Sequence, residues 1–220
     1  MYTIDPSGQA VVVGATGEVG AAIVARLRKA AVPVVAVARD RDRLAQLSAG
    51  DDGITVCAAD IGDDSSGGAI AAAVSGPVRM VVQSAAVPPA GPLATIEPET
   101  LGRSVSLKLG GLLRLIRAVD DRLVPGSRTD AYGPRGVTVH MIAPGALDTH
   151  RLRRFAAAAA DERGVGVETV LGEYRSHSPL GQMTTVDQVS WAVTQLLDPE
   201  ADALHGATLA LDGGARRGLF

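Results

Sequence analysis

Short apolar runs alternate with segments of helical periodicity along most of this chain, and this alternation is the strongest constraint on its fold. The apolar runs lie at residues 10–13, 34–38, 54–58, 79–83, 137–142 and 208–211. Between several of them, apolar side chains recur every three or four residues, most clearly over 101–123. Strands that alternate with helices form right-handed βαβ units. The sequence therefore predicts an α/β fold with a doubly wound parallel sheet.

A glycine-rich segment joins the first strand to the first helix. Glycines three residues apart permit a tight turn and a close approach of the backbone to a pyrophosphate, and the start of the next helix offers free N–H groups. Because the strand–turn–helix context is present, we expect a Rossmann-type dinucleotide site. The expected contacts in this segment are Gly14, Thr16, Gly17, Glu18, Val19 and Gly20. The alternative is a glycine-rich turn that holds no ligand.

The residues after the second strand bear on which dinucleotide is bound. A cofactor without a 2′-phosphate favours an acidic residue at this point, which accepts hydrogen bonds from the ribose hydroxyls. Here Ala38 is followed by Arg39, and Arg41 and Arg43 come soon after. A guanidinium can pair with a phosphate through two hydrogen bonds, so Arg39 favours NADP over NAD. The acidic Asp40 leaves NAD as an alternative cofactor. Arg43 is interpreted as part of a solvated helix face.

The composition excludes several classes of protein. With 46% hydrophobic residues the 220-residue chain can bury the core of one domain, and a net charge of −3 gives no basic surface for nucleic acid. A single cysteine, Cys57, excludes an intramolecular disulfide and a cysteine-based zinc cluster. The first ten residues lack the pattern of a signal peptide, and no apolar run reaches membrane-spanning length. We expect a soluble, cytoplasmic, single-domain protein that acts on a small molecule.

Further segments in a fixed order extend the pattern, and together they resemble the short-chain dehydrogenase/reductase family. They are Asp60-Ile61, Ser84-Ala85, residues 135–139, Pro144-Gly145, Thr149 and residues 211–214. The resemblance implies that Asp60 and Ile61 lie at the adenine and that Ser84 and Ala85 lie near the nicotinamide. Pro144, Gly145 and Thr149 would form the loop on the nicotinamide side. It also implies a dinucleotide-binding half over 1–100 and a substrate half over 101–220, with a lid at about 150–178.

The chain departs from this family where the catalytic residues should be. Gln83 stands in place of the family's asparagine after the fourth strand, and Lys108 in place of the asparagine of its long helix. Only residues 124–134 separate that helix from the next strand, which is too short for the family's serine-bearing strand and Tyr-x-x-x-Lys helix. The residues four before the two lysines are Ala25 and Ser104, so that motif is absent. We expect a sheet that lacks one βα unit and closes with one strand fewer.

Few residues could replace the tyrosine of the missing motif as the proton donor. Lys108 faces the expected cofactor if its helix is buried there, and burial would then lower the pKa of its ammonium group. The alternative is that the lysine extends to solvent. Tyr132 lies in the short connection and would have to turn inward, and His150 follows Thr149 at the mouth of the lid. Ser84 has no evident base, and His140 is interpreted as a hydrogen-bonded core residue.

Three hypotheses remain open for the function. The first is an NADP(H)-dependent reductase in which a different residue serves as the proton donor. The second is an isomerase, dehydratase or cyclase on the same fold. The third is a protein that binds a nucleotide or a partner without catalysis. We also expect a homo-oligomer, and an apolar stripe on the 101–123 helix that stays exposed unless a partner covers it.

Overall fold

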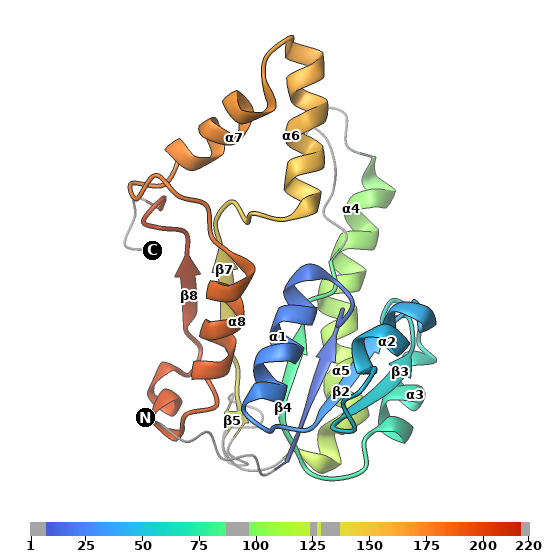
Figure 1. Ribbon diagram of the computed structural model, residues 1–220. Coiled ribbons are helices and arrows are strands. Elements are labelled where there is room, and N and C mark those ends of the chain that lie inside the picture. Colours follow the sequence, from blue (N-terminus) through green and yellow to red (C-terminus); the bar gives the residue numbers. More distant parts are fainter. Residues whose placement is uncertain (1–7, 87–96, 124–126, 129–136, 217–220) are drawn as a thin grey trace.

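The computed structural model describes residues 8–86, 97–123, 127–128 and 137–216. The first half of the chain forms a four-stranded parallel sheet in the order β3-β2-β1-β4 (Figure 1). Its strands are β1 (Gln9–Val13), β2 (Val34–Ala38), β3 (Ile54–Ala58) and β4 (Val78–Gln83). This strand order is that of the first half of a Rossmann fold with a fourth strand added, and it confirms the predicted fold class.

Helices cover both faces of this sheet. On one face lie α1 (Glu18–Lys29), α2 (Arg41–Ser48) and α8 (Val186–Gln195), and on the other lie α3 (Ser66–Ala73) and α5 (Gly111–Val119). Strand β2 is buried along its whole length, as its unbroken apolar run predicts. The sheet is therefore the middle layer of a three-layer arrangement.

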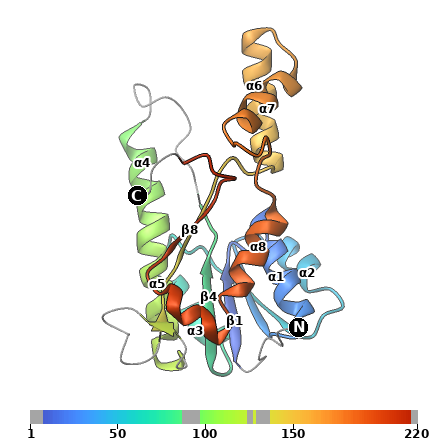
Figure 2. The same cartoon turned by 90° about the vertical axis from the view of Figure 1, so that its left-hand side faces the viewer.

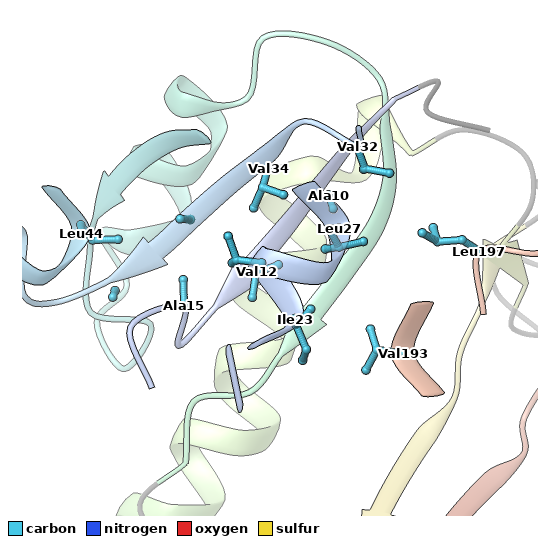
Figure 3. Close-up of a cluster of buried hydrophobic side chains, with 13 residues drawn as sticks. Ala10, Val12, Ala15, Ile23, Leu27, Val32, Val34, Leu44, Val193 and Leu197 are labelled. Carbon is cyan, nitrogen blue, oxygen red and sulfur yellow. The ribbon is translucent and has the colours of Figure 1, made fainter. Parts of the chain in front are cut away.

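Helix α8 completes the first of the two hydrophobic layers. Figure 3 shows its Val193, with Leu197 just beyond its end, facing Ile23 and Leu27 of α1. Ile23 and Leu27 are fully buried, and each side chain of this kind contributes about 1.5–3 kcal/mol to the free energy of unfolding. A capping box between Thr185 and Gln188 begins α8. A segment near the C-terminus thus stabilises the N-terminal half.

The predicted helix over 101–123 is a longer composite of four parts. It comprises α4 (Pro98–Val105), a π-helical turn (Ser106–Gly110), α5 and a 3₁₀ turn (Asp120–Arg122). Leu115 and Val119 face the sheet and are buried. On another face of the helix, four apolar side chains at four-residue intervals are exposed, namely Leu101, Val105, Leu109 and Leu113. The predicted exposed stripe on the 101–123 helix is therefore confirmed as far as Leu113, whereas Val119 further along the helix is buried.

The strands of the second half do not continue the four-stranded sheet among the described residues. The expected strand at 137–142 is split into β6 (Val137–Thr138) and β7 (Met141–Pro144). β7 pairs with β8 (Thr208–Leu211), and β5 (Ser127–Arg128) pairs with β6. At the open edge of β4, Val78 makes an isolated parallel bridge with Leu123. Leu123 thus takes the position next to β4. The described strands do not show the sheet continuing directly with one strand fewer, so the missing βα unit stays a prediction.

The predicted lid is a pair of helices with a core of its own. It consists of α6 (His150–Arg163) and α7 (Val167–Ser176), which stand apart from the sheets in both views (Figures 1 and 2). Gly164 ends α6 in a left-handed conformation at φ 63°. The buried side chains between the two helices are Ala156, Ala160, Val170 and Leu171. The lid can therefore keep its internal packing independently of its contacts with the body.

His140 differs from its interpretation as a hydrogen-bonded core residue. It lies between the end of β6 and the start of β7, and both ring nitrogens are buried without a hydrogen-bond partner among the described residues. Burial lowers the pKa of its imidazole, a trend opposed by the nearby Leu204 carbonyl and Asp202 and reinforced by His205. The interpretation was wrong on both counts: His140 lies outside either strand, and its buried ring nitrogens have no hydrogen-bond partner in the described part of the chain. In the described part of the chain, no helix has the length and hydropathy needed to span a membrane.

Candidate nucleotide-binding site

The turn between β1 and α1 brings the backbone close enough to itself that only glycine fits. Gly14 has a φ of 81°, a conformation that other residues rarely adopt. A Cβ atom on Gly20 would lie 2.1 Å from the Gly14 carbonyl oxygen. The Gly17 N–H donates to that same oxygen at 2.9 Å. The spacing of the three glycines therefore fixes how closely α1 approaches the end of β1.

The start of α1 is left without a side-chain cap. Gly17 is its N-cap residue and supplies no side-chain oxygen, so the N–H groups of the first turn have no side-chain acceptor there. The helix dipole adds a partial positive charge at this end. An uncapped helix N-terminus after a glycine turn is suited to a diphosphate. Thr16, Gly17 and Val19 lie at this position, and their contacts with a cofactor stay predictions.

After β2, the side chain open to solvent is Arg39, because the neighbouring Asp40 already accepts hydrogen bonds as a helix cap. Asp40 is the N-cap of α2, and its Oδ1 accepts hydrogen bonds from the backbone N–H groups of Asp42 and Arg43, each at 3.0 Å. Arg39 is exposed over 73% of its side chain. Arg43 is exposed as expected, but its guanidinium also donates to the carbonyl of Thr16 in the glycine turn. Its interpretation as a merely solvated residue was therefore wrong, since the turn and α2 are brought together only by the fold.

The end of β3 contributes the predicted Asp60 and Ile61. Asp60 Oδ1 accepts from the Gly62 N–H at 2.9 Å, and its Oδ2 lies 3.7 Å from Arg39 Nη1. Ile61 is buried in the hydrophobic layer between the sheet and α5. Asp60 thus faces the same edge of the sheet as Arg39.

The end of β4 carries Gln83, Ser84 and Ala85. The Ser84 hydroxyl donates to the Val13 carbonyl at 2.6 Å, so it ties β4 to β1 and is not paired with a base. Gln83 accepts from the Ala85 N–H at 3.3 Å and donates to the Leu107 carbonyl of the π-helical turn at 3.1 Å. This last contact was not predicted from the sequence. It places the side chain at the family's asparagine position against the long helix.

The loop after β7 leads into the lid. The Gly145 N–H donates to the Leu211 carbonyl at 3.0 Å, which aligns Pro144 and Gly145 with the end of β8. Thr149 is the N-cap of α6, and its Oγ1 accepts from the Leu152 N–H at 3.2 Å. This loop is therefore held in place by the β7–β8 pair at one end and by a capped helix at the other.

Glu18 joins the two parts of the site across 132 residues of sequence. Its carboxylate accepts from the His150 backbone N–H at 2.9 and 3.1 Å, and Oε2 lies 2.9 Å from His150 Nδ1. Partial burial raises the pKa of the Glu18 carboxyl, but the hydrogen bonds and charge of His150 outweigh that and lower it below its usual value. The sequence offered one signal for this contact, a glutamate where a classical family member has glycine.

The three catalytic candidates are not brought together by the described residues. Lys108 is exposed on the π-helical turn, so the expected burial of its ammonium group is not observed. The His150 side chain is 90% exposed and its ring faces Glu18. Tyr132 lies outside the described residues. Their roles stay predictions.

Two family models match the chain. One is described as NAD(P)H-binding and covers residues 14–118, and the other is described as enoyl-(acyl carrier protein) reductase and covers residues 127–216. The first spans the glycine turn through α5, and the second spans the β7–β8 pair and the lid. With the Rossmann-type sheet and the site described above, the two matches agree with the chain's resemblance to the short-chain dehydrogenase/reductase family.

Individual relatives agree with this resemblance. A diacetyl reductase, (S)-acetoin forming, from Staphylococcus aureus is 32% identical over 81 residues, which are 37% of this chain and 31% of that protein. The match thus spans about a third of that relative's length. L-sorbose reductase from Gluconobacter frateurii, in complex with NADPH and L-sorbose, superposes with a TM-score of 0.86 at 18% identity over 99% of this chain and 100% of that one. A short-chain dehydrogenase/reductase from Brucella melitensis gives 0.83 at 20% identity, with the same coverage.

Proposed function

We propose that this chain binds NADP(H) in preference to NAD(H) and acts as a reductase-like enzyme with non-standard catalytic residues. The observation that carries the preference is the engagement of Asp40. Its Oδ1 already accepts two backbone N–H groups at 3.0 Å as the cap of α2, whereas Arg39 remains open to solvent beside it. An acidic residue held as a helix cap is less available to ribose hydroxyls, and a solvent-exposed guanidinium, even one near Asp60, favours a 2′-phosphate.

Arg43 supports the same preference. Its hydrogen bond to the Thr16 carbonyl holds a second guanidinium between α2 and the glycine turn. Two positive charges on the same side of the turn suit a phosphate dianion better than a neutral ribose. The NADPH bound by the L-sorbose reductase is consistent with such a cofactor.

The test is a fluorescence titration with NADPH and NADH, followed through Trp191 and the nicotinamide. We expect saturable binding that is tighter for NADPH, and a loss of about tenfold with Arg39→Ala, equivalent to about 1.4 kcal/mol for a charge-assisted pair. Arg41→Ala is the matched control, because Arg41 is an exposed arginine at the start of α2 that makes no hydrogen bond to the glycine turn among the described residues. Equal affinities for NADPH and NADH would contradict the proposal.

Turnover is tested separately, because the catalytic acid is not identified by the geometry. A screen of small carbonyl compounds with NADPH should include diacetyl and L-sorbose, which the relatives' names suggest. Loss of turnover in Lys108→Ala or Tyr132→Phe would assign the proton donor. Product formation without a change in cofactor absorbance would favour an isomerase, dehydratase or cyclase instead. Tight NADPH binding without any turnover would favour a nucleotide-binding protein that lacks catalysis.

We further propose that the chain forms a homo-oligomer through its long helix. The exposed side chains of Leu101, Val105, Leu109 and Leu113 are an unusually continuous apolar surface for a helix in water. A second copy would remove this surface from solvent.

A further inference from the structure

Glu18 occupies a position that suits a bound anion. It is the first residue of α1, and its carboxylate also accepts the backbone N–H of His150, the first residue of α6. The N-terminus of a helix attracts negative charge, because its N–H groups are unpaired and its dipole is positive there. One carboxylate therefore lies between the N-termini of two helices that are separated by 132 residues in sequence.

The same place is where a dinucleotide would put its diphosphate. In a strand–glycine turn–helix unit the pyrophosphate binds at the N-terminus of the first helix. Glu18 brings a negative charge to that end before any ligand arrives, and like charges at short range repel each other. Partial burial of the Glu18 side chain, 37% exposed, limits screening of that charge by water.

We propose that Glu18 is an internal anion that holds the lid helix α6 against the nucleotide turn in the cofactor-free protein, and that the diphosphate of a dinucleotide must displace it. This inference rests on the proposed function, because it concerns the same nucleotide site. Glu18 is a positioning residue in this account, since it acts on the ligand by holding α6 and by its charge.

The lid is built so that release of this contact leaves its fold intact. The core of α6 and α7 is formed by side chains of those two helices, including Ala156, Ala160 and Leu171. Thr149 caps α6 independently of Glu18, and Asp148 pairs with Arg153 through two hydrogen bonds of 2.8 Å. Breaking the Glu18–His150 contact therefore frees the lid as a unit and does not unfold it.

The central experiment compares the wild-type chain with Glu18→Gln, which removes the charge and keeps the size. We expect the variant to bind NADPH about tenfold more tightly, or about 1.4 kcal/mol. Adenosine 2′-monophosphate carries the 2′-phosphate but no 5′-phosphate, so its affinity should not change. Asp187→Asn is the matched control, because Asp187 is an exposed acidic residue in the first turn of α8. It removes one charge from a helix N-terminus away from the proposed contact.

A second readout needs no ligand. Hydrogen–deuterium exchange over residues 150–176 of the cofactor-free chain should become faster in Glu18→Gln and stay unchanged in Asp187→Asn. NADPH added to the wild-type chain should produce the same acceleration at the start of α6.

The two readouts separate failure of this inference from failure of the proposed function. If the wild-type chain binds both nucleotides and Glu18→Gln binds NADPH no more tightly, the displacement is overturned while NADP(H) binding stands. If neither nucleotide binds, the proposed function fails and the inference that depends on it falls as well. In that case exchange over the lid still tests the contact, because unchanged exchange in Glu18→Gln would show that Glu18 does not hold α6.

Discussion

The same substitution, glycine to alanine, should have opposite effects at two helical positions of this protein. At Gly20 in α1, a Cβ atom would lie 2.1 Å from the Gly14 carbonyl oxygen, 2.8 Å from its carbonyl carbon and 2.9 Å from Ala15 Cα. All three are backbone atoms and cannot rotate away. At Gly68 in α3, nothing lies within 4 Å of the added methyl group.

The size of each effect follows from these distances. Replacing glycine by alanine inside a helix stabilises it by roughly 0.5–1 kcal/mol, mainly through the entropy of the unfolded chain. At Gly68 this gain is unopposed. At Gly20 the nearest contact is about 1.3 Å short of an ordinary 3.4 Å contact, so α1 must move away from the turn. Overpacking of this kind costs about 1–3 kcal/mol, and the net result is a loss of roughly 1–2 kcal/mol.

Urea unfolding followed by far-ultraviolet circular dichroism measures both effects. We expect Gly68→Ala to raise the free energy of unfolding and Gly20→Ala to lower it. For a chain of this length the melting temperature of Gly20→Ala should fall by roughly 2–8 °C. NADPH binding should weaken in Gly20→Ala alone, because only that change displaces the helix N-terminus. If Gly20→Ala were as stable as Gly68→Ala, the proposed closeness of α1 to the β1 turn would be refuted.

Two further predictions concern stability at low pH and assembly. Burial lowers the pKa of His140 in the folded state, so the unfolded chain binds a proton more readily, and the stability that this residue contributes is lost as the pH falls through about 6.5. Chemical unfolding at pH 7.5 and 5.5 measures how much the free energy of unfolding depends on pH. We expect this dependence to be smaller in His140→Phe than in the wild-type chain. An equal dependence in the two would contradict the lowered pKa of His140. If the long helix pairs with a second copy, Leu109→Glu with Leu113→Glu should convert the oligomer to a monomer in light scattering after size-exclusion chromatography, whereas Val56→Glu on strand β3, also exposed, should leave it unchanged.

Most of the first half of the fold could be predicted, because its signals are local. The apolar runs at β1 and β2 match the observed strands to within one residue, and the glycine-rich turn lies between β1 and α1 as expected. A strand buried on both faces needs an unbroken apolar run, and a tight turn from a strand into a helix needs closely spaced glycines. Both requirements are met by neighbours in sequence, so the sequence displays them directly.

The second half was predicted less well, because its strands depend on distant partners. The run at 137–142 reads as one strand, but the structure divides it and leaves His140 between the two parts. Lys108 likewise occupies a helical position that periodicity assigns correctly, whereas its exposure depends on what packs against the π-helical turn. Hydrophobic periodicity indicates which face of an element is apolar and does not say what covers it.

The sequence by itself predicts the class of site, and the tertiary structure decides which residues around it are brought into contact. Glycine spacing, the strand before it and the arginine after β2 are constraints of backbone sterics and of charge, and they hold wherever such a unit folds. The engagement of Arg43 with Thr16 and of Glu18 with His150 joins residues 27 and 132 positions apart. Such contacts exist only once the chain path has brought two helix ends to the same edge of the sheet, and no local pattern encodes that path.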